Sequence, residues 1–181
     1  LGRRRLVVVI VCAVALRFLW LDADPWVFKH PGDIGDEGYW ALAARNLALL
    51  GTYHPDEYVQ AAVAPFFTAF VWPIYQLFGV TLMATRLPSA LAAAASVGLV
   101  YAALQSEDRR GALVAALLLA VDHKFFVYSR IGHVEIMLGA ILLGSYLALA
   151  RDRYLLAGLL FGLSVATKLT AFWMAVPFAL Y

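Results

Sequence analysis

Long apolar stretches separated by short polar segments run along the whole sequence. A transmembrane helix needs about 20 predominantly apolar residues. Charge-poor stretches near that length occur at residues 5–22, 87–105, 110–128, 131–150 and 154–181. We predict one transmembrane helix in each of the first four stretches, and one long helix or two short helices in the last. The predicted fold class is therefore all-α, a polytopic transmembrane helix bundle.

The segment 23–86 separates the first two of these stretches and has a different pattern. From residue 36 to 50, apolar residues recur at helical spacing opposite Arg45 and Asn46, and Gly51 is placed to end that helix. This pattern is typical of an amphipathic helix that lies on the membrane surface. We therefore expect a juxtamembrane helix in this segment.

An uncharged window follows at residues 58–85 and is long enough to cross a bilayer. We predict that its central part, residues 62–79, does not cross and forms another amphipathic helix, although crossing stays open as an alternative. The segment 23–86 is then one extracytoplasmic loop with juxtamembrane helices. Asp56 and Glu57 are expected in a solvated turn of this loop.

Composition supports an integral membrane protein and excludes other classes. Of the 181 residues, 64% are hydrophobic and 14% are charged, and the mean hydropathy of +0.79 lies well above that of a soluble domain. The net charge is +2 and the basic residues are scattered, so the electrostatic signature of nucleic-acid binding is missing. Cys12 is the only cysteine, which excludes an internal disulfide and a cysteine-rich metal site.

The basic residues Arg3, Arg4 and Arg5 precede the first apolar stretch and place the N-terminus in the cytoplasm. A secretory signal has the same basic start and apolar middle. Its cleavage site, at Ala13-x-Ala15, would fall inside the apolar run, so we favour an uncleaved signal anchor in the plasma membrane. The Lys and Arg residues of the whole chain divide evenly between the two sides, so the positive-inside rule does not decide the remaining topology.

The topology in which residues 62–79 do not cross places most ionisable residues near the apolar stretches on the extracytoplasmic side. Charges within membrane segments are costly and are usually paired or functional. Their collection on one side is what a single active site requires. These residues are Asp36, Glu37, Lys124, Arg130, Glu135 and Lys168.

Five segments together resemble, in order, the N-terminal part of the GT-C glycosyltransferases, and most of all the protein O-mannosyltransferase and aminoarabinose-transferase branch. The segments read DEGYWALAARNLALLGTY, APFFTAFVWPIYQLFG, ATRLPSALAAAASVGLVYAAL, FFVYSRIGHVEIMLGAILLGSYLALA and RYLLAGLLFGLSVATKLTAF. The resemblance implies a polyprenyl-phosphate sugar as donor, transfer on the extracytoplasmic side, and a catalytic aspartate in a first outer loop that carries amphipathic helices. It also implies that the chain is the N-terminal part of a longer enzyme.

The chemistry of sugar transfer requires a carboxylate and cations, which are the groups found near the apolar stretches. Transfer of a sugar to a hydroxyl needs a carboxylate that takes the hydroxyl proton, and cations that stabilise the departing phosphate. We predict Asp36 as the base with Glu37 as the alternative. Acids that simply favour a helix N-terminus are the structural alternative for both. In the family a second acid begins the helix that here holds Glu135, which would orient the acceptor or tune the base, or else pair with Arg130 or Lys168.

The remaining site predictions concern the two substrates. Arg130, Lys168 and Lys124 are candidates for the donor phosphate, since arginine offers bidentate contacts and lysine a point charge. Tyr39 and His133 are candidates for binding the acceptor, which is a protein, a lipid or a glycan. The histidines lack metal-ligand spacing within any one helix, so we predict no cofactor, with a divalent metal as the lesser alternative.

Other functions stay open. The aminoarabinose branch carries a Glu-Lys pair before the segment that here reads AVAPFFT, and both charges are missing, which leaves the sugar open. Charged residues and prolines in apolar stretches also mark transporters, although the two halves of the chain show no repeat. A non-catalytic fragment or subunit, completed by a companion chain with further helices, is the other alternative.

Overall fold

The computed structural model describes residues 3–23, 36–52 and 63–180. Every regular element within these ranges is helical, which confirms the predicted all-α class. The elements up to α7 are α1 (Arg3–Ala15), the 3-10 helix η1 (Leu16–Phe18), α2 (Asp36–Leu50), α4 (Pro65–Phe78), α5 (Leu82–Leu104), α6 (Arg109–Val121) and α7 (His123–Ser129). They are followed by α8 (Val134–Leu149), α9 (Tyr154–Thr167), the 3-10 helix η2 (Leu169–Met174) and α10 (Ala175–Ala179).

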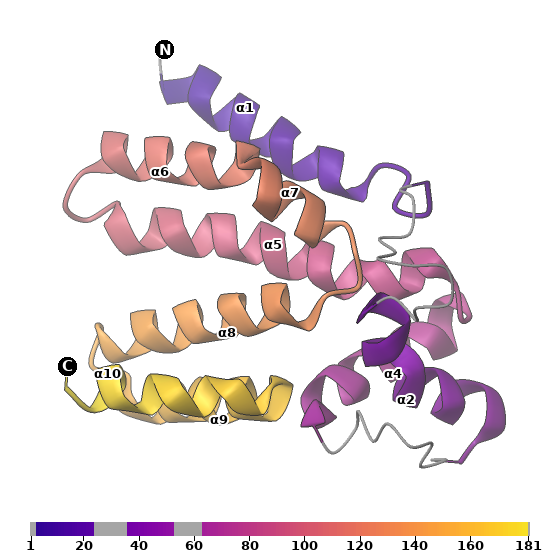
Figure 1. Ribbon diagram of the computed structural model, residues 1–181. Coiled ribbons are helices and arrows are strands. Elements are labelled where there is room, and N and C mark those ends of the chain that lie inside the picture. Colours follow the sequence, from indigo (N-terminus) through magenta and orange to yellow (C-terminus); the bar gives the residue numbers. More distant parts are fainter. Residues whose placement is uncertain (1–2, 24–35, 53–62, 181) are drawn as a thin grey trace.

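Five helices lie side by side and form a bundle, in the order α1, α6, α5, α8 and α9 (Figure 1). The N-terminus, the α5–α6 turn and the α8–α9 turn lie at one end of this bundle. The loop helices α2 and α4 pack together at the other end, beside the start of α5 (Figure 1). The bundle therefore has two chemically different ends, and the loop helices cover only one of them.

The helix α2 is held by an apolar core that also includes α4, α5 and α8. Trp40 and Ala44 of α2 share this core with Phe67 and Val71 of α4. The amphipathic pattern thus places one face of α2 against protein. Asn46, expected on the polar face, is instead only 5% exposed, while Gly51 follows the last residue of α2 with a φ of 65° that glycine adopts without strain.

Two breaks divide apolar stretches that the hydrophobic pattern leaves continuous. Asp122 ends α6 and caps α7 by accepting a hydrogen bond from the Phe125 amide at 2.7 Å, and the two helices are bent by 61°. At Lys168 the backbone becomes extended between α9 and η2. Phe161 of α9 and Phe178 of α10 pack together with ring centroids 5.3 Å apart, so α10 folds back along α9.

By length and composition, α5 is the one described helix that can cross a membrane unaided. The bent pair of α6 and α7 passes the same test when taken as one span, and the apolar helices α8, α9 and η2–α10 are shorter. The spans predicted at 87–105, 110–128, 131–150 and 154–181 coincide with α5, with α6–α7, with α8 and with α9 to α10. Their passage through the membrane stays a prediction.

Two buried arginines fasten the end of α1. Arg17, which lies near the end of an apolar stretch where a long side chain can reach the interface, is instead fully buried and donates to the carbonyls of Ala13 and Ala120 at 2.7 and 2.8 Å. Arg130 donates to the carbonyls of Leu16, Arg17 and Trp20 at 2.8–3.0 Å. The Ala120 carbonyl of α6 and the Arg130 side chain of the turn after α7 therefore hold the segment that follows α1.

Candidate active site

The candidate site lies at the end of the bundle that α2 and α4 cover. The starts of α2, α5 and α8 and the break after α9 meet there (Figure 1). Two groups of ionisable side chains occupy this end. One is a buried ion pair, and the other is a partly exposed cluster.

The buried ion pair joins Glu37 in the first turn of α2 to Arg86 near the start of α5. Arg86 Nε lies 2.6 Å from Glu37 Oε1, and Arg86 Nη2 lies 3.0 Å from Glu37 Oε2. Arg86 is fully buried and also donates to the Leu21 carbonyl at 2.6 Å. This fork-to-carboxylate geometry is strong and directional, so the beginning of α2 is fixed against α5.

The same carboxylate accepts a third hydrogen bond, from the Gly132 amide to Glu37 Oε1 at 2.9 Å. Gly132 lies in the turn between α7 and α8, and a Cβ added to it would come within 2.8 Å of Thr85 Cγ2 and 3.1 Å of Glu37 Cγ. The close approach of three segments therefore requires glycine at this position.

A Gly132→Ala variant is expected to lose about 1–3 kcal/mol of unfolding free energy, because the new methyl group has no room between Thr85 and Glu37. Thermal unfolding followed by circular dichroism in detergent measures the change. Gly139→Ala is the matched control, since its Cβ meets nothing within 4 Å and alanine favours a helix by about 1 kcal/mol. Equal stability of the two variants would contradict the close packing at Gly132.

Tyr75 of α4 contacts Thr85, which lies beside Gly132 and the buried ion pair. Its hydroxyl lies 2.5 Å from Thr85 Oγ1, and the Thr85 hydroxyl donates to the Thr81 carbonyl at 2.9 Å. The Thr85 proton is thus engaged, so Tyr75 is the donor between the two hydroxyls. Burial raises the pKa of Tyr75 and keeps this proton in place at neutral pH.

The partly exposed cluster forms around Glu135 in the first turn of α8. One carboxylate oxygen pairs with Lys168 Nζ, and the other contacts Nδ1 of His133. The Glu135 side chain is 40% exposed and that of Lys168 is 22% exposed. Because Lys168 lies where the backbone leaves α9, the cluster joins the beginning of one apolar helix to the end of the next.

Neighbouring groups orient this cluster. Lys168 Nζ lies 5.0 Å from the ring centroid of Trp40, a cation–π contact with α2. The His133 ring meets Tyr128 edge to face at 5.2 Å. The Ser89 hydroxyl donates to the His133 carbonyl and accepts from the His133 amide, both at 3.0 Å. Trp40 thus places α2 in contact with the cluster as well as with the buried pair.

The structure brings together some of the predicted site residues and separates others. Glu37, Glu135, His133 and Lys168 all lie at this end, and Glu135 pairs with Lys168, one of its two predicted alternatives. Asp36 is the first residue of α2, one helical turn before Trp40, and its side chain lies outside the described part of the chain. The predicted turn with its second acidic pair lies outside the described residues too.

The other predicted residues lie in different surroundings. Lys124 is exposed in the first turn of α7, and no described contact joins it to Lys168 or Glu135. Arg130 is 7% exposed and is engaged by the carbonyls that follow α1. Tyr39 packs edge to face on Trp40, with ring centroids 5.3 Å apart.

Two residues of the site were missed by reasoning from the sequence. Arg86 lies in one of the motifs that carry the family resemblance, and an arginine in the first turns of a long apolar helix needs an anionic partner. Trp40 is one of the apolar residues that recur at helical spacing between residues 36 and 50, and that pattern gives it no further role. Neither the partner of Arg86 nor that of Trp40 is close in sequence, so only the fold identifies them. In the described ranges, no three His, Cys, Asp or Glu side chains group so as to hold a metal ion.

Comparison with protein families gives one match. The family described as dolichyl-phosphate-mannose-protein mannosyltransferase matches residues 62–181, well over half of the chain. This range begins before α4 and includes Arg86, the Glu135 cluster and the break at Lys168. A search of curated proteins and a search of solved structures each found no match.

Proposed function

Because the chain belongs to the dolichyl-phosphate-mannose-protein mannosyltransferase family, we propose that it transfers a sugar, with inversion, from a polyprenyl-phosphate donor to an acceptor hydroxyl on the extracytoplasmic side of the membrane. Members of this family are membrane glycosyltransferases that use polyprenyl-phosphate sugars. The observation that carries the proposal is the meeting of the start of α2, which bears Asp36, with the Glu135–Lys168 pair at one end of the bundle.

In the proposed reaction, the acceptor oxygen attacks the anomeric carbon of the sugar from the face opposite the phosphate. The bond between that carbon and the phosphate oxygen breaks, and the polyprenyl phosphate leaves with the bonding electron pair. Asp36 takes the proton of the acceptor hydroxyl. A positioned general base of this kind contributes roughly 10²–10⁴ in rate.

Glu37 has a supporting role in this proposal. Both of its carboxylate oxygens are bound by Arg86, and one also accepts the Gly132 amide. A carboxylate held in this way stabilises the start of α2 and is poorly available to a substrate proton. Glu37 and Arg86 are therefore positioning residues that fix the backbone of Asp36.

The donor phosphate is proposed to bind at Lys168. Negative charge grows on the phosphate as the bond breaks, and a nearby ammonium group stabilises it. Glu135 and the Trp40 ring hold this ammonium group in place, and the Glu135 side chain is exposed enough for a ligand to approach. His133 and Tyr39, which flank this region on α8 and α2, are proposed to contact the acceptor.

The guanidinium of Arg130 donates to three carbonyls near η1. In this proposal it fixes the segment after α1 rather than the phosphate. Exposed Lys124 offers a cation away from the cluster. Lys168 and Lys124 thus form a matched pair for a binding test.

The orientation also belongs to the proposal. The turns opposite the site carry the exposed residues Arg109, Arg110, Arg151 and Arg153, and α1 begins at the same end (Figure 1). The arginines at the start of α1 favour the cytoplasmic side for this end. The site end then faces the extracytoplasmic side, where the first loop covers it with α2 and α4.

A Lys168→Gln variant is expected to bind a short-chain polyprenyl phosphate at least about 10-fold more weakly than the parent chain, because it loses a charge-assisted contact with the phosphate. Titration followed by native mass spectrometry in mild detergent measures the apparent Kd. Lys124→Gln is expected to bind as the parent does. Unchanged binding in Lys168→Gln, or an equal loss in both variants, would overturn the assignment of the phosphate to Lys168.

A further inference from the structure

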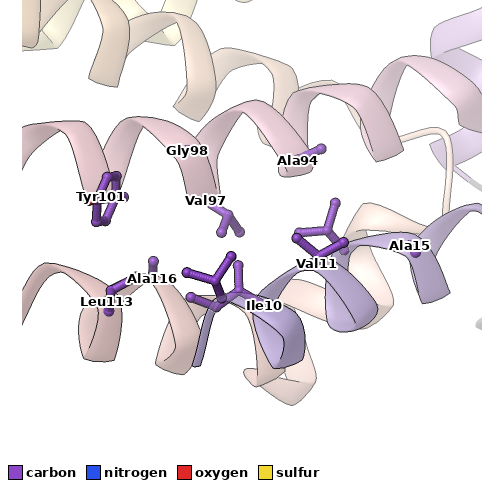
Figure 2. Close-up of a pocket in the computed structure, with 11 residues that line it drawn as sticks. Ile10, Val11, Ala15, Ala94, Val97, Gly98, Tyr101, Leu113 and Ala116 are labelled. Atoms are coloured by element: carbon purple, nitrogen blue, oxygen red, sulfur yellow. The ribbon is translucent and has the colours of Figure 1, made fainter. Parts of the chain in front are cut away.

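A ligand-sized cavity lies between α1, α5 and α6, away from the proposed donor site. It is a partly open cavity of about 500 Å³ with an almost wholly apolar lining (Figure 2). Ile10 and Val11 of α1 face Val97 and Gly98 of α5 across it, and Leu113 of α6 closes one side. Cavities of roughly 300–1,000 Å³ commonly hold small ligands or parts of larger ones.

The cavity extends toward the basic end of the bundle. Tyr101 of α5 lines it, and Arg109 Nε donates to the Tyr101 hydroxyl at 3.3 Å, so a guanidinium lies directly beside the apolar space. Arg110, Arg4 and Arg5 are exposed at the same end of α6 and α1. These four arginines outnumber the exposed acids of the adjoining turn, Glu107 and Asp108.

We propose that this cavity binds one hydrocarbon chain of an anionic phospholipid, whose phosphate contacts Arg109 at the basic end. The apolar lining matches a hydrocarbon chain, and the flanking cations match an anionic head group. Val7 and Val11 of α1 are 42% and 60% exposed, so a chain can enter from the side of α1. The lipid then completes the packing between α1 and the rest of the bundle.

The donor's own lipid tail is the competing occupant. Tyr101 lies 15 residues beyond Arg86 along α5, which is about 22 Å of helix. A donor phosphate at Lys168 is thus at the far end of the bundle from Arg109. The phosphate and the apolar tail of a phospholipid match Arg109 and the cavity together, whereas a donor bound at Lys168 places its phosphate away from them.

Gly98 and Arg109 allow the two halves of the proposal to be tested separately. A Cβ built on Gly98 meets nothing within 4 Å, so Gly98→Leu fills the cavity without a backbone clash. Gly158→Leu in α9 is the matched control, because Gly158 is exposed, has the same open space and does not line the cavity. Arg109→Gln removes the charge at the cavity mouth, and Arg153→Gln removes an exposed charge at the α8–α9 turn.

The experiment is a titration of the chain in mild detergent with phosphatidylglycerol and, separately, with phosphatidylcholine of the same acyl chains, followed by native mass spectrometry. The parent chain is expected to prefer phosphatidylglycerol. Arg109→Gln is expected to lower this preference about 5-fold, while Arg153→Gln keeps it. Gly98→Leu is expected to weaken the binding of phosphatidylglycerol at least about 10-fold, and Gly158→Leu is expected to leave it unchanged.

Three outcomes would overturn the proposal. Equal binding of the two phospholipids excludes recognition of the anionic head group. An unchanged affinity in Gly98→Leu, in a chain that circular dichroism shows to be folded, places the lipid elsewhere. Binding of polyprenyl phosphate that is lost in Gly98→Leu, without binding of phosphatidylglycerol, assigns the cavity to the donor tail. The Lys168→Gln titration is a separate measurement, so the fate of the donor site does not decide this one.

Discussion

An Asp36→Asn variant is expected to fold and to bind the donor, but to lose about 10²–10⁴ of its rate of sugar transfer. Asparagine has nearly the same shape as aspartate and cannot take a proton from the acceptor hydroxyl. The measurement is the transfer of labelled sugar from a polyprenyl-phosphate donor to an acceptor in membranes that contain the protein. The loss should appear in kcat rather than in KM, because the base acts only as the bond forms.

Asp56→Asn is the matched control for this variant, since Asp56 is an acid of the same predicted loop with no role in the proposed reaction. It is expected to transfer sugar at the parent rate. Full activity in Asp36→Asn, together with normal expression, would remove Asp36 as the base. Glu135 would then be the carboxylate to test next, because it is partly exposed at the same end of the bundle.

An Arg86→Ala variant is expected to lose about 3–5 kcal/mol of unfolding free energy, the largest stability effect that we predict. The substitution leaves the Glu37 carboxylate, whose side chain is only 15% exposed, without its bidentate partner, and an unpaired charge of this kind is costly. The contact with the Leu21 carbonyl is lost as well. Thermal unfolding in detergent measures the change, and Arg45→Ala, an exposed site on α2, is expected to stay within about 0.5 kcal/mol of the parent.

Conservative variants separate the positioning role of this pair from its effect on stability. Arg86→Lys keeps the charge but cannot reproduce two parallel hydrogen bonds. We expect it to recover part of the stability while kcat stays low, because the start of α2 is no longer fixed in orientation. Recovery of stability and kcat in the same proportion would mean that Arg86 only stabilises the fold.

The class of fold could be predicted from the sequence because each helix carries its own signal. The apolar stretches predicted the helices from α5 to α9, and Gly51 follows α2 directly, as its position suggested. The bend at Asp122 is local too, since the carboxylate caps the following helix. The angle of 61° between α6 and α7 depends on how the neighbouring helices pack, so the apolar stretch alone does not predict it.

The candidate site could be predicted only in part, because its contacts join residues far apart in sequence. Arg86 binds Glu37 across 49 residues, and Lys168 binds Glu135 across 33. The sequence indicates that Glu135 needs a cationic partner, but it does not distinguish between Arg130 and Lys168. The fold separates these two cations, since the carbonyls after α1 engage Arg130 and the break after α9 places Lys168 beside the carboxylate.

The hydrogen bonds of Arg17 and Arg130 determine when α1 can pack against the rest of the bundle during synthesis. Arg17 Nη2 donates to the carbonyl of Ala120, which lies 103 residues later in the chain. Arg130 donates to the carbonyl of Leu16, which lies 114 residues earlier. A nascent chain that ends before Ala120, near the end of α6, holds neither contact, so its Arg17 must remain hydrated at the membrane surface. The first helix therefore enters its final place late, after α6 and α7 have emerged from the ribosome.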